Sequence, residues 1–364
     1  MVGEALLIAS ERLADFVTAI FIAARTRPDF ARETAQHLVA ANLKGHDSHG
    51  VGMAPNYVDA IANGHLAPDA EAEMLEDRGA ILRVDGRFGF GQVVGRQATD
   101  LAIERVRDAG VVTLALRNAH HLGRIGTYAE RCARAGCVSL HFVNVTGHDP
   151  VVSPFAGREA RLLTNPFCCA VPRNGERPIV LDMATSAIAL GKVRVAYMKE
   201  EPVADDTLLD NEGLPTTDAR YLYEEPKGSI RPFGLHKGYG LGLVCELLAG
   251  ALAGERTIQP EHPRPNAIVN HMLMFVLDPD LFGGSAAFAA EVEAMADYLR
   301  RTPAAEGHDR VRLPGDPEAE STEQRLAHGI PIDDNSWADI LAAAGRAGLS
   351  GDEIDALTAD RRAG

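Results

Sequence analysis

The stretch His46-Asp-Ser-His-Gly-Val-Gly-Met53, with Tyr57 shortly after it, decides how the rest of the chain is interpreted. It follows an amphipathic run, so its polar side chains are expected at the end of a helix, where functional sites are commonly built. Its imidazoles, carboxylate and hydroxyl could form a metal cluster, an acid/base site or a hydrogen-bonded helix end. The two histidines stand three residues apart without an evident further ligand. This favours the helix end over the metal, and we predict no metal site.

The composition is that of an ordinary globular protein rather than a disordered or fibrous one. The chain has 364 residues, of which 46% are hydrophobic and 24% charged, and chains of this length usually divide into more than one lobe. Its net charge is −15, and such a field repels phosphate backbones and anionic lipid surfaces. We therefore expect no nucleic-acid partner and no membrane partner.

The cysteine spacing and the N-terminal residues indicate a reducing compartment. The cysteines have neither the paired C-x-x-C spacing of a zinc site nor the even count of a secreted disulfide framework. They are Cys132, Cys137, Cys168, Cys169 and Cys245. The N-terminal residues show no basic leader with a cleavage site, and no uncharged apolar run approaches the ~18 residues that a membrane span requires. We expect a cytoplasmic protein.

Helical periodicity at both ends of the chain frames a central region of strands and helices. Apolar residues at three- and four-residue spacing predict terminal helices over 10–25, 28–44, 285–301, 316–328, 336–347 and 352–361. Strands are predicted over 80–84, 111–116, 138–145 and 268–277, and further helices over 92–109, 128–135 and 233–252. The polar, turn-rich stretch 205–229 is expected to be a surface excursion.

The glycine-rich stretch Gly89–Gly95 could be taken for a dinucleotide-binding loop, but it departs from the Rossmann fingerprint. The third glycine of that fingerprint would stand at Val94. The acid that binds ribose should end the next strand, where Arg117 and Asn118 stand instead. A plain tight turn is favoured over a phosphate loop.

Polar groups gather at the ends of other predicted strands. The stretch Arg117–Gly126 places histidines and glycines after a strand, which is typical of a ligand site, with a histidine-containing turn as the alternative. Asp182 follows a short apolar strand and is either part of a site or the N-cap of the next helix. Cys168 and Cys169 have no local base to activate a thiol, which favours buried packing over a nucleophile.

Six short motifs occur in one order along about 270 residues of the chain. They are Asp47-Ser-His-Gly50, Asn118-x-x-His121-x-Gly123, Thr164-Asn-Pro166, Leu181-Asp-Met-Ala-Thr-Ser186, His236-Lys-Gly-Tyr-Gly-Leu241 and Leu313-Pro-Gly-Asp316. Together they resemble the type 2 malate/L-lactate dehydrogenase family, whose fold is unrelated to that of the Rossmann dehydrogenases. Within the family, the stretches 45–53, 120–126 and 165–168 most resemble the hydroxycarboxylate dehydrogenase members.

The resemblance implies an α+β fold with two parts: a non-Rossmann, mixed-sheet cofactor-binding domain and a helical domain formed from the N- and C-terminal parts of the chain. The N-terminal helical part, with the catalytic histidine, would span residues 1–75. The mixed-sheet NAD(P)-binding domain would span 76–300, and the C-terminal helical part, packed with the N-terminal part, would span 301–364. The resemblance also implies a homodimer, since the family tends to build its sites across a two-fold interface.

The resemblance further implies an NAD(P)-dependent oxidoreductase that interconverts 2-oxo acids and 2-hydroxy acids by hydride transfer. An imidazole has an intrinsic pKa near neutrality, which suits the accompanying proton transfer. His49 is the leading proton donor, and His121 matches a position cast as proton acceptor in other members. The sequence leaves open which of the two transfers the proton. Substrate contacts fall on Ser48, Met53 and Tyr57.

The cofactor, NAD or NADP, is assigned by position to strand ends and glycine turns. The implied positions are Gly123, Arg124, Ile125, Val180, Leu181, Asp182, Met183, Ala184, His236, Lys237, Asn270, Gly315, Asp316, Pro317 and Glu318. Arg124 could supply positive charge to a phosphate, with an ordinary surface arginine as the alternative.

Two positions depart from the family's pattern. Many relatives carry arginine where Met53 stands, and that arginine can hold a substrate carboxylate in a bidentate fork. A soft, apolar side chain there predicts a bulkier substrate, such as an aromatic 2-oxo acid of the phenylpyruvate type. Asp316 replaces the family's usual glutamate, and its shorter side chain puts its reach to a ribose hydroxyl in doubt.

Other functions stay open as alternatives. Within the family, the chain could be a malate, L-lactate or ureidoglycolate dehydrogenase or a cyclic imino acid reductase. In another class, it could be a nicotinamide-binding protein without catalysis, although such a protein would have no use for His49 and His121 together.

Overall fold

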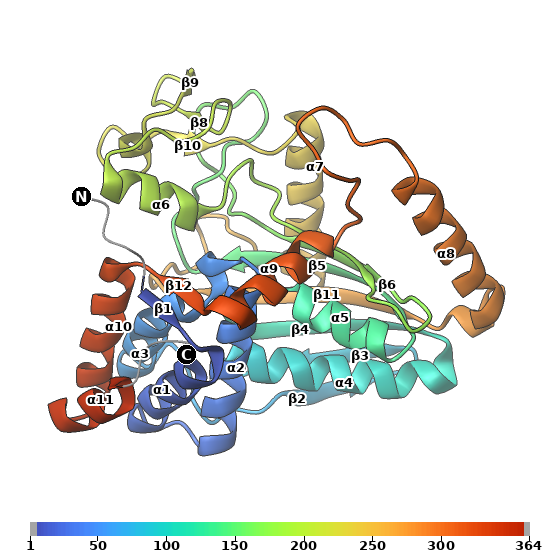
Figure 1. The fold of residues 1–364 in the computed structure, drawn as a ribbon, viewed down its shortest axis with the longest axis horizontal. Helices are drawn as coiled ribbons and strands as arrows, with labels where there is room; N and C mark the ends of the chain where they lie inside the picture. The colour runs from blue at the N-terminus through green and yellow to red at the C-terminus, as the bar shows by residue number, and fades with distance from the viewer. Residues whose placement is uncertain (1–5, 360–364) are drawn as a thin grey trace.

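A seven-stranded mixed sheet forms the centre of the computed structural model, which describes residues 6–359 (Figure 1). In spatial order the strands are β2 (Glu73–Asp77), β3 (Ile81–Asp85), β4 (Val111–His120), β11 (Val269–Leu277), β5 (Val138–Thr146), β6 (Phe167–Val171) and β7 (Ile179–Met183). Strands β3 and β4 are parallel, and the other neighbouring pairs are antiparallel. A Rossmann sheet is mostly parallel, so the predicted non-Rossmann α+β fold is confirmed.

Helices cover both faces of this sheet. On one face, α4 (Gly91–Ala109) packs its apolar side on β4 and β11, and α5 (Gly126–Arg134) packs on β5 and β6. On the other, α7 (His236–Cys245) continues into the π-helical segment η4 (Glu246–Ala253), which contacts β5 and β11. Strand β11 lies between the two layers and is almost entirely buried, which explains its nearly continuous apolar sequence.

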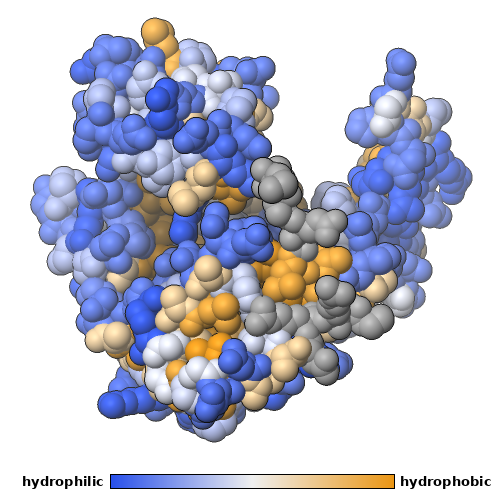
Figure 2. Space-filling view, turned by 60° about the vertical axis from the view of Figure 1, so that its left-hand side comes forward, coloured by the Kyte–Doolittle hydropathy of each residue, from blue (hydrophilic) through white to orange (hydrophobic). Residues whose placement is uncertain are grey.

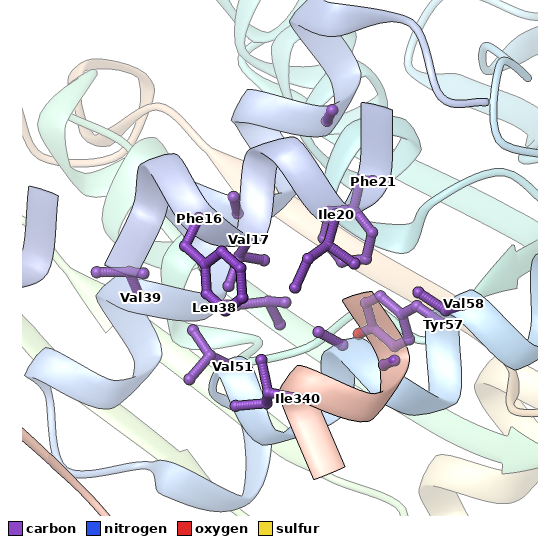
Figure 3. Close-up of a cluster of buried hydrophobic side chains, with 14 of the residues drawn as sticks. Phe16, Val17, Ile20, Phe21, Leu38, Val39, Val51, Tyr57, Val58 and Ile340 are labelled. Atoms are coloured by element: carbon purple, nitrogen blue, oxygen red, sulfur yellow. The ribbon is translucent and has the colours of Figure 1, made fainter. Parts of the chain in front are cut away.

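A helical part is built from both ends of the chain. It contains α1 (Ser10–Ala23), α2 (Pro28–Leu43), α3 (Ala54–Ala62), α10 (Asp334–Ala347) and α11 (Gly351–Thr358). Figure 3 shows its core, in which Phe16 and Leu38 from the N-terminal helices lie near Ile340 of α10. A two-stranded sheet of β1 (Leu6–Ile8) and β12 (Ile330–Ile332) also joins the two ends. The predicted domain boundaries remain a prediction.

The stretch expected to be a surface excursion is instead part of a small lobe, so that expectation is wrong. It contains β8 (Leu208–Leu209), β9 (Pro215–Thr216), the 3-10 turn η3 (Ala219–Leu222) and β10 (Ser229–Ile230), which pack with α6 (Leu190–Lys199). Leu208, Leu222 and Ile230 are buried there against Val193 of α6. These apolar residues are widely spaced among polar ones, which hid the core from a periodicity search.

The remaining helices lie in the C-terminal third. Helix α8 (Ser285–Arg300) follows the turn η5 (Pro279–Leu281) and stands at one end of the sheet, and α9 (Asp316–His328) crosses back toward the helical part (Figure 1). The predicted final helix extends to residue 361, but residues 360 and 361 lie outside the described range, as do residues 1–5 of the predicted leaderless N-terminus. Among the described residues, no helix has the length and hydropathy needed to cross a membrane.

Candidate active site

The stretch from His46 to Met53 forms two short 3-10 turns, η1 (Asp47–His49) and η2 (Val51–Met53), which fold back on the end of α2. Asn42 of α2 holds this fold, because its amide donates to Asp47 (2.6 Å) and accepts from the backbone N–H of Val51 (2.8 Å). Gly50 lies directly against that amide: a Cβ added there would meet Asn42 Oδ1 at 2.2 Å. The glycine of this motif is therefore required by packing.

Helix α9 anchors the same stretch from the C-terminal side. Arg325 donates to Asp47 (2.6 Å), and His46 Nε2 lies 3.2 Å from Glu318. The hydrogen bond to His46 holds the pKa of Glu318 below its usual range. Both polar neighbours of the catalytic candidate thus support the helix end. Within residues 6–359, no group of three or more His, Cys, Asp or Glu side chains is placed to hold a metal ion.

His49 comes from this stretch and meets His121 from the end of β4. Their rings stack with centroids 5.4 Å apart and planes 24° apart. His49 Nδ1 lies 3.0 Å from the Ser48 hydroxyl, and His121 Nδ1 lies 2.7 Å from the Tyr57 hydroxyl. Neither Nε2 atom has a hydrogen-bond partner among the described residues. Both rings are half-buried, and the Nε2 atom of each is therefore available to hydrogen-bond a ligand.

His121 is held by backbone contacts on both sides. The N–H of His120 donates to Gly89 O (3.0 Å), and the N–H of Leu122 donates to the Asn270 side chain (2.8 Å). The Tyr128 hydroxyl donates to Leu122 O (2.6 Å). Asn270 is buried in β11 and its amide also donates to Asn144 O (3.0 Å), so in this structure its side chain holds the His121 loop.

The two candidate imidazoles are neutral at pH 7. Burial, followed by the positive fields of His46 and Arg124, lowers the pKa of His49 to about 4. Burial, followed by the field of His49, also lowers the pKa of His121 well below its ordinary value. In this state each ring can accept a proton or donate one hydrogen bond, and it becomes an acid only when a nearby negative charge raises its pKa.

Ser48 and Met53 contact different parts of the protein. Ser48 lies under α6, where a Cβ added at Gly191 would meet the Ser48 Cβ at 2.8 Å. Figure 2 shows a hollow on this face below the small lobe, with apolar side chains on its walls. Met53 is partly buried and packs against the core of the helical part.

Arg124 is buried in an ionic cluster, which excludes the surface arginine left open by the sequence. Its side chain is 2% exposed, donates to Glu130 (2.7 Å) and lies 3.7 Å from Asp182. The Asp182 carboxylate also accepts from the N–H of Gly126 at the start of α5 (2.7 Å). The N-cap interpretation of Asp182 for the following helix is wrong, since α6 begins after Ala189. Burial raises the pKa of Asp182 while Arg124 opposes that shift.

Three predicted cofactor segments converge beside this cluster. Asp182 links β7 to the loop of Gly123 and Ile125, and the N–H of Val180 donates to Pro314 O (3.0 Å), just before Gly315. Residues 181–184 continue β7 into the following turn. Gly315 adopts a left-handed φ of 100° and precedes α9, in which Asp316 and Pro317 form the first turn. These segments are far apart in sequence and adjacent in space.

Other parts of the predicted cofactor set have different surroundings. Asp316 already accepts from the N–H of Leu313 (2.9 Å) and from Arg300 (3.3 Å), so Glu318 is the less engaged acid of this turn. His236 and Lys237 are exposed at the first turn of α7. That end of α7 is joined to the turn after β7, because the N–H of Phe233 donates to Thr185 O (3.1 Å).

The glycine-rich stretch Gly89–Gly95, which leads into the first turns of α4, serves packing. A Cβ added at Gly91 would meet His121 O at 2.2 Å, and one added at Gly95 would meet the Tyr128 ring at 2.8 Å. Protein atoms thus fill the space that a phosphate would need, as expected for the turn interpretation. Cys168 is also buried, and burial raises the pKa of its thiol well above the ordinary value, which excludes a ready nucleophile.

The sequence analysis missed Gln92, His37 and His148. Gln92 donates to the Tyr57 hydroxyl (2.8 Å), and its signal is a polar residue within the buried apolar face of α4. His37 of α2 is buried, its Nε2 has no partner, and it lies 2.8 Å from the position of a Cβ at Gly123. His148 follows β5 at the sheet end that carries His120, and no local pattern distinguishes it.

Known proteins resemble this chain along most of its length. The malate/L-lactate dehydrogenase family model matches residues 8–341. The chain is 42% identical to hydroxycarboxylate dehydrogenase B of Escherichia coli K12, over 96% of each chain. It is 46% identical to an L-lactate dehydrogenase of Cupriavidus necator, over 84% of this chain and 88% of that one.

The solved structure of sulfolactate dehydrogenase from Methanocaldococcus jannaschii has a TM-score of 0.83 and 31% identity, covering 96% of this chain and 99% of that one. The match therefore extends over both the central sheet and the helical part that carries His49. The chain belongs to the type 2 malate/L-lactate dehydrogenase family.

Proposed function

We propose that the protein is a nicotinamide-dependent dehydrogenase that interconverts 2-oxo acids and 2-hydroxy acids, with His49 and His121 handling the proton. Family membership makes the chain an oxidoreductase acting on the CH-OH group of hydroxy acids. The observation that carries the residue assignment is the stacked imidazole pair, in which both Nε2 atoms are left for a ligand. Such a pair can bind and exchange a proton with one substrate oxygen.

The converging segments around β7 fit a dinucleotide. We propose that the dinucleotide is held by residues of these segments. They are Val180, Leu181, Asp182, Met183 and Ala184, the loop Gly123–Ile125, the turn Gly315–Glu318, and His236, Lys237 and Asn270. Gly315 supports this proposal, since it has no Cβ to block the backbone at the start of α9, where N–H groups favour negative charge. The exposed Lys237 adds positive charge at the start of α7. Asn270 would contribute by accepting from the N–H of Leu122 and so fixing the loop that leads to Gly123.

When bound, the nicotinamide ring accepts or supplies the hydride. The chain's own residues then move the proton: His49 takes it from the hydroxyl when a 2-hydroxy acid is oxidised and returns it during reduction. A neutral His49 is ready for oxidation. For reduction it must first be protonated, and the carboxylate of a bound 2-oxo acid favours this because a nearby anion raises an imidazole pKa.

The substrate is proposed to be a 2-oxo acid with a bulky side chain, such as an aromatic one of the phenylpyruvate type. Met53 supports this, since an apolar thioether stands where many relatives offer a charged fork. Ser48, next to His49, is the proposed polar contact. Tyr57 acts on the substrate through His121.

A spectrophotometric screen tests the proposed function. NADH and NADPH oxidation is followed with pyruvate, oxaloacetate, sulfopyruvate and phenylpyruvate, and a cyclic imino acid tests the reductase alternative. Oxidation of malate, lactate and ureidoglycolate is followed in the reverse direction. Turnover of an oxo acid supports the proposal. Cofactor binding by fluorescence titration, without turnover of any oxo, hydroxy or imino acid, would instead support the non-catalytic alternative.

We further propose a cytoplasmic homodimer. Exposed apolar residues on one side of α7 and η4, including Leu243, Val244 and Leu247, support burial against a second copy. Light scattering coupled to size exclusion measures the oligomeric state, and a monomer at micromolar concentration would contradict the dimer.

A further inference from the structure

We propose that Gln92 and Tyr57 form a positioning chain that holds the neutral His121 ring in the tautomer with its proton on Nε2. His121 would then donate a hydrogen bond to the substrate oxygen, and His49 would exchange the proton. The inference rests on the proposed function, because it divides the roles of the two imidazoles in that reaction.

The direction of the hydrogen bonds carries the inference. Gln92 Nε2 donates to the Tyr57 oxygen (2.8 Å), and the same hydroxyl lies 2.7 Å from His121 Nδ1. A tyrosine hydroxyl has one hydrogen to give. With the Gln92 N–H already directed at its oxygen, Tyr57 donates that hydrogen to His121 Nδ1. A neutral imidazole that accepts at Nδ1 carries its proton on Nε2.

The chain is rigid because both positioning residues are enclosed by the core. Tyr57 has no exposed surface, and its ring packs among three others. The distance between ring centroids is 6.1 Å to Phe21, 6.0 Å to Phe90 and 5.2 Å to His120. Figure 3 shows Tyr57 beside Phe21 and Val58 in this packing. Gln92 is 1% exposed. Burial raises the pKa of Tyr57, so the hydroxyl keeps its hydrogen.

The surroundings of His121 oppose its protonation. Burial is the largest cause that lowers the pKa of His121, and the neighbouring His49, His120, His37 and His148 lower it further when they carry charge. A protonated His121 would donate from Nδ1 to the Tyr57 oxygen, and the buried Tyr57 hydroxyl hydrogen would then have no acceptor among its two partners, Gln92 and His121. His121 is therefore suited to polarise a carbonyl oxygen as a neutral donor.

His49 has the complementary arrangement. If its proton lies on Nδ1 and is donated to the Ser48 hydroxyl, 3.0 Å away, its Nε2 lone pair faces the ligand side. With a nicotinamide bound that would take the hydride from the substrate carbon, the chain's part in the oxidation is to accept the proton: the substrate O–H bond breaks and its proton joins His49 Nε2. The carbon–oxygen single bond becomes a double bond whose oxygen accepts from His121 Nε2–H. Reduction reverses each of these changes.

The experiment measures the tautomer of His121 directly. Full-length protein labelled with ¹⁵N-histidine is studied by long-range ¹H–¹⁵N correlation at pH 7.5, and His121→Gln assigns the resonances. The test variants are Tyr57→Phe, which keeps the ring in the core, and Gln92→Met, which keeps the length without a donor. Tyr223→Phe is the matched control, because it removes a buried tyrosine hydroxyl of the small lobe that has no hydrogen-bond partner among the described residues and does not touch the His121 loop.

We expect the wild-type His121 to be protonated on Nε2, and this preference to weaken in Tyr57→Phe and Gln92→Met but not in Tyr223→Phe. The value of kcat should fall roughly tenfold in Tyr57→Phe, the size expected for one lost hydrogen bond in the transition state, with a smaller change in KM. A wild-type proton on Nδ1, or a tautomer unchanged in Tyr57→Phe, would overturn the inference. The NMR measurement needs no substrate, so failure of the proposed function is recognised separately by absent wild-type turnover.

Discussion

The imidazoles of His49 and His121 lie in a stack with centroids 5.4 Å apart, although one belongs to the helical part and the other to the central sheet. Two imidazolium cations at this separation would repel each other in a buried site, so the pair holds at most one extra proton. The reaction proposed here needs one proton for each hydride. The number of protons that the pair can hold therefore equals the number transferred in a single oxidation or reduction.

Replacing His49 with alanine should remove the proton exchange while leaving the cofactor segments in place. We expect kcat to fall by roughly 10²–10⁴-fold, the range for losing a general acid or base. Cofactor Kd, measured by fluorescence titration, should change little. His308→Ala, at an exposed position, is the control for histidine removal. Near-normal turnover in His49→Ala would assign the proton exchange to His121.

The buried histidines should make the protein unstable toward acid. Burial lowers the pKa of His37, His120 and His141 to about 3, whereas an unfolded imidazole has a pKa of about 6.5. Below pH 6.5 the unfolded chain therefore binds protons that the native state refuses. The free energy of unfolding should be insensitive to these groups above pH 6.5 and should decrease as pH falls from 6.5 toward 3.

Urea unfolding between pH 7.5 and 5.0 measures this slope. His141→Gln should make it shallower by up to one proton, or about 1.4 kcal/mol per pH unit well below pH 6.5. His308→Gln removes an exposed imidazole and should leave the slope as it is. Equal slopes in wild type and His141→Gln would mean that His141 titrates normally in the native state.

Met53→Arg should shift substrate preference toward small and acidic 2-oxo acids. An arginine at this position could form a bidentate pair with a carboxylate, which Met53 cannot. We expect the ratio of kcat/KM for oxaloacetate over phenylpyruvate to rise at least tenfold, since charged hydrogen bonds contribute about 1.5–3 kcal/mol. Met53→Leu keeps the apolar character and should keep the ratio. A ratio unaffected by the arginine would place residue 53 away from the substrate.

The buried pair of Arg124 and Asp182 predicts different effects for two replacements of the acid. Asp182→Ala leaves a buried guanidinium with Glu130 alone and removes the acceptor for Gly126 N–H. We expect a loss of about 3–5 kcal/mol in unfolding free energy, as for breaking a buried ion pair. Asp182→Asn keeps an acceptor oxygen for Gly126 and should lose less. Equal losses would show that the Gly126 hydrogen bond contributes nothing.

The long periodic elements could be predicted from the sequence, because each depends on local pattern, whereas the assignment of the site residues stays a prediction. Helices α1, α2 and α4 follow their apolar spacing closely, and the motif containing His121 occurs at a strand end as expected. The pairing of β1 with β12 could not be predicted, since these three-residue strands are too short to show a period and lie at opposite ends of the chain.

The sequence also does not show the direction in which each side chain points in the folded protein. The sequence shows Arg124 as a free cation and Asp182 as a possible cap, but only the fold brings them together inside the protein. Gln92 was equally hidden, because its importance comes from Tyr57, which belongs to a different helix and core. Such contacts between distant segments have no local signature.

Gly50→Ala tests whether packing behind His49 fixes the active imidazole. A new Cβ would meet Asn42 Oδ1 at 2.2 Å, so the amide must move and weaken its bonds to Asp47 and Val51. We expect a loss of about 1–3 kcal/mol in unfolding free energy, as for an overpacked core, together with lower kcat because His49 is displaced. Gly52→Ala is the matched control, since a Cβ at Gly52 has no neighbour within 4 Å and its φ is not positive. Unfolding in urea gives the stability and steady-state kinetics gives kcat. If both glycine variants behave alike, the contact with Asn42 does not position His49.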